Sequence, residues 1–87
     1  MKRICVTVRW TRGLHLRAAA ELTRLTHRFS SQVCLQLGSQ IADARSVLSL
    51  MLLSASIGTA LEVEASGADE HEAIEAIQNF FHQPGEG

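Results

Sequence analysis

A histidine and an arginine, two residues apart, form a segment suited to handling phosphate. His15 lies directly before a run of helix-forming residues, and Arg17 follows within it. The first backbone N–H groups of a helix have no intrahelical partner and lie at the positive end of its dipole, so they stabilise an anion. Histidine is nucleophilic near neutral pH, and a guanidinium is a permanent forked cation. The pair therefore predicts a phosphoryl group accepted on His15, steadied by Arg17 and passed on.

The same two residues also have simpler structural interpretations. A lone histidine before a helix is often an ordinary cap, and Arg17 also suits a surface ion pair with Glu21, worth about 0.3 to 0.5 kcal/mol. So weak a pair yields easily to a phosphate, so both roles are compatible. We interpret His27, His71 and His82 as structural or solvated. No set of side chains has metal-ligand spacing, and we expect neither metal nor cofactor.

The net charge of −1 conceals a strong asymmetry along the chain. Seven of the eight cations lie between residues 2 and 28, and seven of the nine acids lie between residues 62 and 86. The early cations are Lys2, Arg3, Arg9, Arg12, Arg17, Arg24 and Arg28. They predict a basic face around His15 that attracts an anion or an acidic partner. A nucleic-acid-binding domain is an alternative, less favoured because the chain has no tyrosine and a segregated acidic half.

Length and composition favour one small domain. The 87 residues suffice for a modest core, with residues 82–87 expected as a frayed tail. No apolar stretch is long enough to span a bilayer, and the first residues alternate like a strand, so we expect a cytoplasmic protein without membrane insertion. Cys5 and Cys34 are too few for a disulfide framework and are expected as free thiols.

Hydrophobic periodicity predicts seven secondary-structure elements. These are strands over 4–8, 33–37, 40–43 and 61–65, and helices over 16–29, 47–53 and 70–81. The order β-α-β-β-α-β-α indicates an α+β domain with a four-stranded antiparallel sheet and three helices on one face. Because a ferredoxin-like fold begins with the same six elements, periodicity alone leaves the topology open.

Capping residues predict where two of the helices begin. Ser46 is the expected N-cap of the short helix, whose Leu and Met content is too high for complete burial. Two overlapping capping boxes, Ser66 with Asp69 and Asp69 with Glu72, mark the start of the last helix. The sequence thus predicts local hydrogen bonds in which these side-chain oxygens accept from nearby backbone N–H groups.

Three blocks of the sequence resemble HPr, the histidine-containing phosphocarrier family of the bacterial phosphoenolpyruvate-dependent sugar phosphotransferase system. They are Gly13-Leu-His-Leu-Arg-Ala-Ala19, Ala44-Arg-Ser-Val-Leu-Ser-Leu-Met51 and Ala65-Ser-Gly-Ala-Asp-Glu70. The resemblance implies an HPr-like open-faced sandwich whose fourth strand lies between the first and second. Cys5 and Cys34 would then be roughly 9 to 10 Å apart, too far for a disulfide.

The resemblance also implies a function, that of a phosphocarrier and not an enzyme that turns over a free substrate. Enzyme I, charged from phosphoenolpyruvate, would donate a phosphoryl group to Nδ1 of His15, and an EIIA-type domain would accept it. The family's partner-facing patch matches Leu16, Ala20, Val47, Leu48 and Met51. Its basic rim would be formed by Arg12, Arg17, Arg24 and Arg45. A regulatory HPr paralogue, of a nitrogen-type or other signalling branch, remains an alternative that acts by protein binding.

Departures from the family pattern bear on regulation and on partner choice. In some members the serine matching Ser46 is a regulatory phosphorylation site, which would make a serine kinase a further partner, although the capping role suffices to explain this residue. Ala18 replaces the usual proline after the active-site arginine. Ser54 and Ser56 stand where the family often has glycines, so we expect a reshaped turn or a longer short helix.

Overall fold

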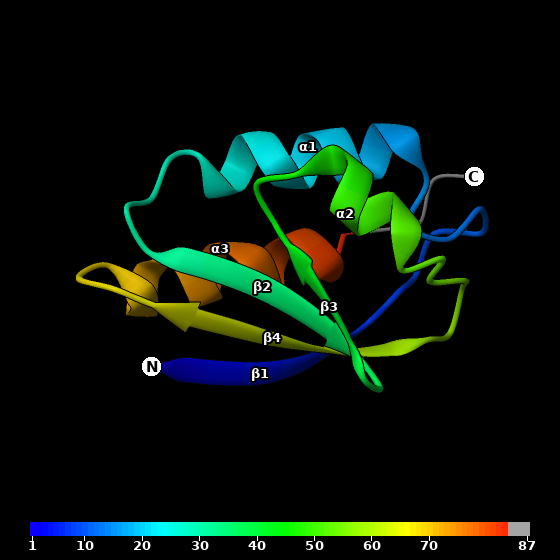
Figure 1. The fold of residues 1–87 in the computed structure, drawn as a ribbon. Coiled ribbons are helices and arrows are strands. Elements are labelled where there is room, and N and C mark those ends of the chain that lie inside the picture. Colours follow the sequence, from blue (N-terminus) through cyan, green and yellow to red (C-terminus); the bar gives the residue numbers. More distant parts are fainter. Residues whose placement is uncertain (84–87) are drawn as a thin grey trace.

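Seven elements follow one another in the computed structural model, which describes residues 1–83 (Figure 1). The strands are β1 (Lys2–Thr7), β2 (Gln32–Leu37), β3 (Gln40–Asp43) and β4 (Ala60–Ser66). The helices are α1 (Leu16–Thr26), α2 (Val47–Leu52) and α3 (Glu70–Phe81). The predicted order β-α-β-β-α-β-α is confirmed. Most of the predicted frayed tail lies outside the described residues, but His82 still caps α3.

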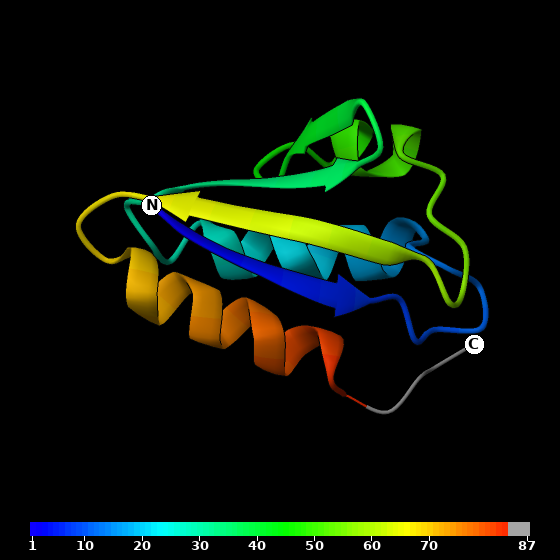
Figure 2. The same cartoon turned by 90° about the horizontal axis from the view of Figure 1, so that it is seen from below.

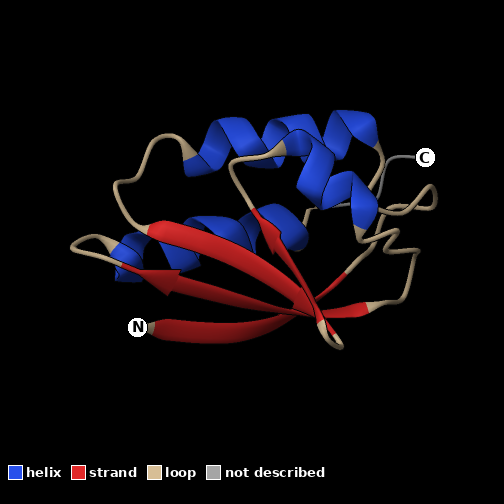
Figure 3. Ribbon diagram, in the orientation of Figure 1, coloured by secondary structure: helices blue, strands red, loops and turns tan. Residues whose placement is uncertain are grey.

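The four strands form one antiparallel sheet in the order β1-β4-β2-β3. The strand β4 therefore lies between β1 and β2, as the resemblance implies, and this order resolves the topology that periodicity left open. All three helices lie on one side of the sheet, and none of the elements in the described part of the chain covers its other face (Figures 1 and 3). Figure 2, turned by 90°, shows α1 and α3 side by side beneath the sheet.

Alternation along each strand decides which side chains enter the core. In β4, Leu61, Val63 and Ala65 are buried, whereas the intervening glutamates face the open side. Burial of each large aliphatic side chain contributes about 1.5 to 3 kcal/mol. At one end of the core Trp10 packs against Phe80 and Phe81, with ring centroids 5.4 and 5.3 Å away. This cluster anchors the segment that leads from β1 towards α1.

The first helix is shorter than the apolar periodicity predicts. It ends at Thr26, and residues 27–29 continue as turns whose backbone N–H groups bond to carbonyls two to four residues earlier. The Thr26 hydroxyl lies 2.9 Å from the Thr23 carbonyl and 3.1 Å from the Ala44 carbonyl. This contact with a distant segment accompanies the end of the helix, while Phe29 still packs against the core.

The predicted capping boxes of α3 are wrong. Asp69 occupies the N-cap position but makes no capping hydrogen bond from its side chain. Its carboxylate instead accepts hydrogen bonds from Ser30 and Ser31, which lie far away in the sequence. The Gly67 N–H is satisfied by Glu70 Oε1 at 3.0 Å. A tertiary contact has therefore replaced the expected local one.

Candidate functional site

The segment before α1 holds His15 in place through backbone hydrogen bonds. The Leu14 N–H donates to the Ala55 carbonyl at 2.8 Å, and the Leu14 side chain is buried. Gly13 has φ +71, and a Cβ on it would lie 2.5 Å from the same Ala55 carbonyl oxygen. Only glycine fits so close an approach in this backbone conformation. His15 itself has extended backbone angles and is the N-cap of α1.

The two ring nitrogens of His15 have different surroundings. Nδ1 accepts a hydrogen bond from the Ala18 N–H at 3.5 Å, at the long limit for such a contact. Nε2 is buried and has no hydrogen-bond partner among residues 1–83. Because Nδ1 faces a donor, this geometry favours the tautomer with the proton on Nε2 and a lone pair on Nδ1. The nitrogen suited to attack an external electrophile is thus Nδ1, and only a weak bond holds its lone pair.

The start of α1 provides a positive environment around this ring. No acidic residue lies in the first turn, so the dipole of the helix is not offset there. Arg17 is exposed at the second helical position, and none of the ion pairs of residues 1–83 includes it. The alternative Arg17–Glu21 pair is therefore not formed. The Arg17 guanidinium and the first amides of α1 are therefore available to an anion.

An apolar surface lies beside this site. The helix α2 packs against α1 (Figure 1), and four apolar side chains on the two helices are exposed to solvent. Their exposed fractions are 62% for Leu16, 69% for Leu48, 37% for Met51 and 66% for Leu52. We call these four residues the apolar patch. The prediction that the Leu and Met run is only partly buried is confirmed, because Leu50 and Leu53 are buried whereas the patch residues of the same helix are exposed.

The predicted partner-facing residues are not equally accessible. Val47 is half-buried and packs against the core, and Ala20 is half-buried on α1. Leu52 was expected to add to the apolar surface but was not among the predicted partner-facing residues, although it stands one helical turn after Leu48 and therefore shares its face. The exposed fraction of each side chain, which periodicity alone does not predict, distinguishes the accessible residues from the half-buried ones.

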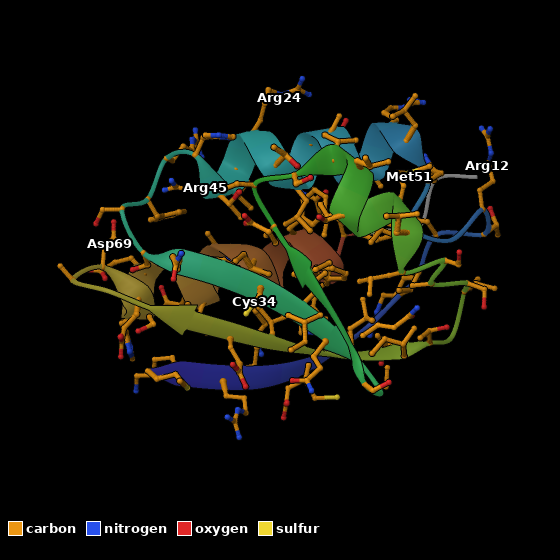
Figure 4. The ribbon with its side chains drawn as sticks, in the orientation of Figure 1. Arg12, Arg24, Cys34, Arg45, Met51 and Asp69 are labelled. Atoms are coloured by element: carbon orange, nitrogen blue, oxygen red, sulfur yellow. The ribbon has the colours of Figure 1, made fainter. Side chains whose placement is uncertain are left out.

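The predicted basic rim is spread along the whole of α1. Arg12 lies in the loop before the helix, and Arg24 lies in the last turn of α1 (Figure 4). Arg45 is near the opposite end of α1 from His15, where its Nη2 donates to the Phe29 carbonyl at 2.6 Å. Arg45 therefore satisfies an orphan carbonyl in the turn that follows α1. Arg12 and Arg17 are the rim residues on the His15 side.

Ser46 takes the predicted capping role. Its hydroxyl accepts a hydrogen bond from the Ser49 N–H at 3.1 Å, and the side chain is half-buried. The α2 helix is not lengthened by the serines that follow it: it ends at Leu52 with Leu53 as C-cap. Ser54 then adopts φ +52, the left-handed conformation that glycine prefers. The turn keeps a glycine-like backbone without a glycine.

Within residues 1–83 no group of three or more His, Cys, Asp or Glu side chains is placed to hold a metal ion. None of the helices in this described part is long and apolar enough to cross a membrane.

Comparison with known proteins gives consistent matches over most of the chain. The family model described as "PTS HPr component phosphorylation site" matches residues 2–83. The phosphocarrier protein HPr of Cupriavidus necator is 43% identical over 65 residues, 75% of this chain and 73% of that protein. The phosphocarrier protein NPr of Proteus mirabilis is 40% identical over 70 residues, 79% and 78% of the two chains. The structure of HPr from Thermoanaerobacter tengcongensis has a TM-score of 0.89 at 32% identity, covering 93% of this chain and 91% of that one.

The strand order, the three helices on one face and these matches define the class as an open-faced sandwich of the phosphocarrier type. Within that class the chain belongs to the HPr family of phosphocarrier proteins of the phosphotransferase system.

Proposed function

We propose that Nδ1 of His15 accepts a phosphoryl group from phosphorylated enzyme I and passes it to an EIIA-type domain in the cytoplasm. In the first step the Nδ1 lone pair forms a bond to phosphorus, and the bond between phosphorus and the donor breaks with its electron pair left on the donor. The second step repeats this displacement with the acceptor as nucleophile. The single observation that carries the proposal is the lone pair of Nδ1 at the open start of α1, opposite a buried Nε2.

The surroundings suit a carrier that must release what it binds. The amides of the first turn and the Arg17 guanidinium stabilise the charge of a phosphoryl group on Nδ1. The site is open on the Arg17 side, so water screens these interactions and keeps the bound state from becoming too stable to transfer. In-line transfer then depends mainly on how accurately donor, phosphorus and acceptor are aligned.

Phosphorylation in vitro tests this directly. Incubation with phosphoenolpyruvate and enzyme I should give one acid-labile phosphoryl adduct per chain, measured by intact mass. His15→Ala should abolish the adduct. His71→Ala, an exposed histidine on α3, is the matched control and should retain it. Absence of an adduct in the unchanged chain, or its survival in His15→Ala, would overturn the proposal.

The apolar patch is the proposed docking surface for both partners. Exposed apolar side chains beside the site would provide affinity, while Arg12 and Arg17 would speed encounter with acidic partners. Leu48→Ser should lower the rate of phosphorylation by enzyme I by about tenfold, mainly through weaker binding. Ile41→Ser is the control, because Ile41 is exposed to a similar degree (66% against 69%) but lies on β3. An equal loss in both variants would contradict this location.

A regulatory role is the second candidate, and the match to an NPr protein favours it over nucleic-acid binding. In this form the chain would act by protein binding in a nitrogen-type or other signalling branch, with EIIA-type domains of a nitrogen-type branch as binding partners. Phosphorylation of Ser46 by a serine kinase would place added negative charge at the start of α2, next to the patch. Comparing transfer rates to sugar-type and nitrogen-type EIIA domains would distinguish the branches, and incubating Ser46→Ala with the kinase would test the serine.

A further inference from the structure

A groove between α1 and α3 is separate from the His15 site. It has a volume of about 710 Å³, within the usual range of small-molecule sites. One wall is formed by α1, through Glu21, Arg24 and Leu25, together with Arg28 from the turn after it. The other wall is formed by α3, through Ala76, Asn79 and Phe80, together with Gln83 just beyond its end. The two helices run side by side in opposite directions (Figure 2), so each end of the groove has residues from both.

Two cations in this groove have no partner in the fold. Arg24 lies in the last turn of α1, Arg28 lies four residues later in the turn that follows the helix, and both line the groove. Neither guanidinium makes an ion pair or a hydrogen bond with any residue in 1–83. Both side chains can therefore reach a single phosphate, with up to two forked hydrogen bonds each. The Arg45 side chain, by contrast, is already engaged with a carbonyl.

The rest of the groove is suited to the body of the ligand. Leu25 and Phe80 form an apolar floor, and Asn79 and Gln83 bring carboxamides from the opposite wall. Glu21 lies on α1, seven residues before Arg28, and would repel a second negative charge, but it accepts hydrogen bonds from hydroxyl groups. The groove thus has an anion-binding end and a hydroxyl-binding end, with an apolar surface between them.

We propose that this groove binds a small polyhydroxylated organic phosphate. The phosphate lies between the guanidinium groups of Arg24 and Arg28, the hydroxyls bond to Glu21, Asn79 and Gln83, and the C–H face of the ligand covers Leu25 and Phe80. A purely acidic partner would use only the arginines and would meet repulsion from Glu21. For that reason the mixed lining favours the sugar-phosphate type of ligand over an acidic peptide.

The test is a titration of the ¹⁵N-labelled chain with glucose 6-phosphate, followed by amide chemical shifts. Saturable shifts are expected in residues 21–28 and 76–83, with a dissociation constant of about 1 to 10 mM for so open a site. Inorganic phosphate and glucose, run separately, should each bind at least about tenfold more weakly, because each has only part of the recognised chemistry.

Variants make the outcome decisive. Arg28→Gln should weaken binding by about tenfold. Arg9→Gln removes the same charge from an exposed position outside the groove and should leave the affinity unchanged. Dispersed spectra of both variants would show that they fold. Shifts confined to residues 15–18, equal affinity in Arg28→Gln, or saturation by a polyglutamate peptide but not by the sugar phosphate would each overturn the proposal. None of these outcomes depends on transfer through His15.

Discussion

Asp69 and Ser31, 38 residues apart in the sequence, are joined by two hydrogen bonds. The carboxylate accepts from the Ser31 N–H at 2.9 Å and from the Ser31 hydroxyl, and it also accepts from the Ser30 N–H. Gly67 lies so close that a Cβ there would be 2.7 Å from Ser31 Cα. This cluster fastens the loop before β2 to the loop before α3, so it links the two long helices at the end of the fold remote from His15.

Ionised Asp69 should make stability depend on acid pH. The Ser31 hydroxyl first, and then the Ser30 N–H, hold the pKa of Asp69 at about 2, below its ordinary value of 3.8. A carboxyl whose folded pKa is lowered stabilises the fold above the unfolded pKa, and this contribution is lost as pH falls from 3.8 towards 2. Urea midpoints measured between pH 5 and pH 2 should therefore fall across this window, and Asp69→Asn should reduce the fall. Identical pH profiles for parent and variant would exclude this linkage.

Ser54→Gly should stabilise the protein. Ser54 is exposed and has φ +52, where a Cβ is unfavourable and glycine is not. Removing the Cβ should raise the free energy of unfolding by about 0.5 to 1 kcal/mol. The extra conformational entropy that glycine gives the unfolded chain reduces this gain. Chemical denaturation measures the change. Ser56→Gly is the control, since Ser56 is not among the positive-φ residues, and it should not stabilise; a gain from it as large as that from Ser54→Gly would refute the explanation.

The sequence predicts best what neighbouring residues decide. The alternation of Leu61, Val63 and Ala65 sets the buried face of β4, and the Ser46 hydroxyl caps the helix that begins beside it. The Asp69 cap was predicted by the same local rule and failed, because a partner from another loop competes for the same carboxylate. Local spacing contains no information about that partner.

The residues of the site also differ in how far the sequence predicts their positions. His15 and Arg17 are two residues apart and share the start of one helix, so their proximity follows from the chain alone. Arg45 was expected near them, but the path of the chain through β2 and β3 brings it to the far end of α1. The burial of Nε2, which supports the proposal that Nδ1 is the nucleophile, likewise depends on the packed surroundings of the ring.

Gly13→Ala should cost more stability than Gly38→Ala. Both glycines have positive φ, +71 and +61, so alanine strains the backbone by about 1 kcal/mol at either position. At Gly38 no atom lies within 4 Å of the added Cβ, whereas at Gly13 the Ala55 carbonyl oxygen is 2.5 Å away. Overlap with backbone should bring the total at Gly13 to roughly 3 kcal/mol. Urea unfolding compares the two, and equal losses would mean that the Ala55 contact is unimportant.

Cys34 should react more slowly with alkylating reagents than Cys5. Both are free thiols facing the open side of the sheet, on strands separated by β4. Burial first, and then the Glu64 and Asp43 carboxylates, raise the pKa of Cys34, so less of it is thiolate at a given pH, whereas Cys5 is exposed. Iodoacetamide labelling at pH 8, followed by peptide mass spectrometry, should therefore modify Cys5 first. Glu64→Gln should speed labelling of Cys34 by removing one of the facing charges; equal rates at both cysteines, or no effect of Glu64→Gln, would contradict this electrostatic account.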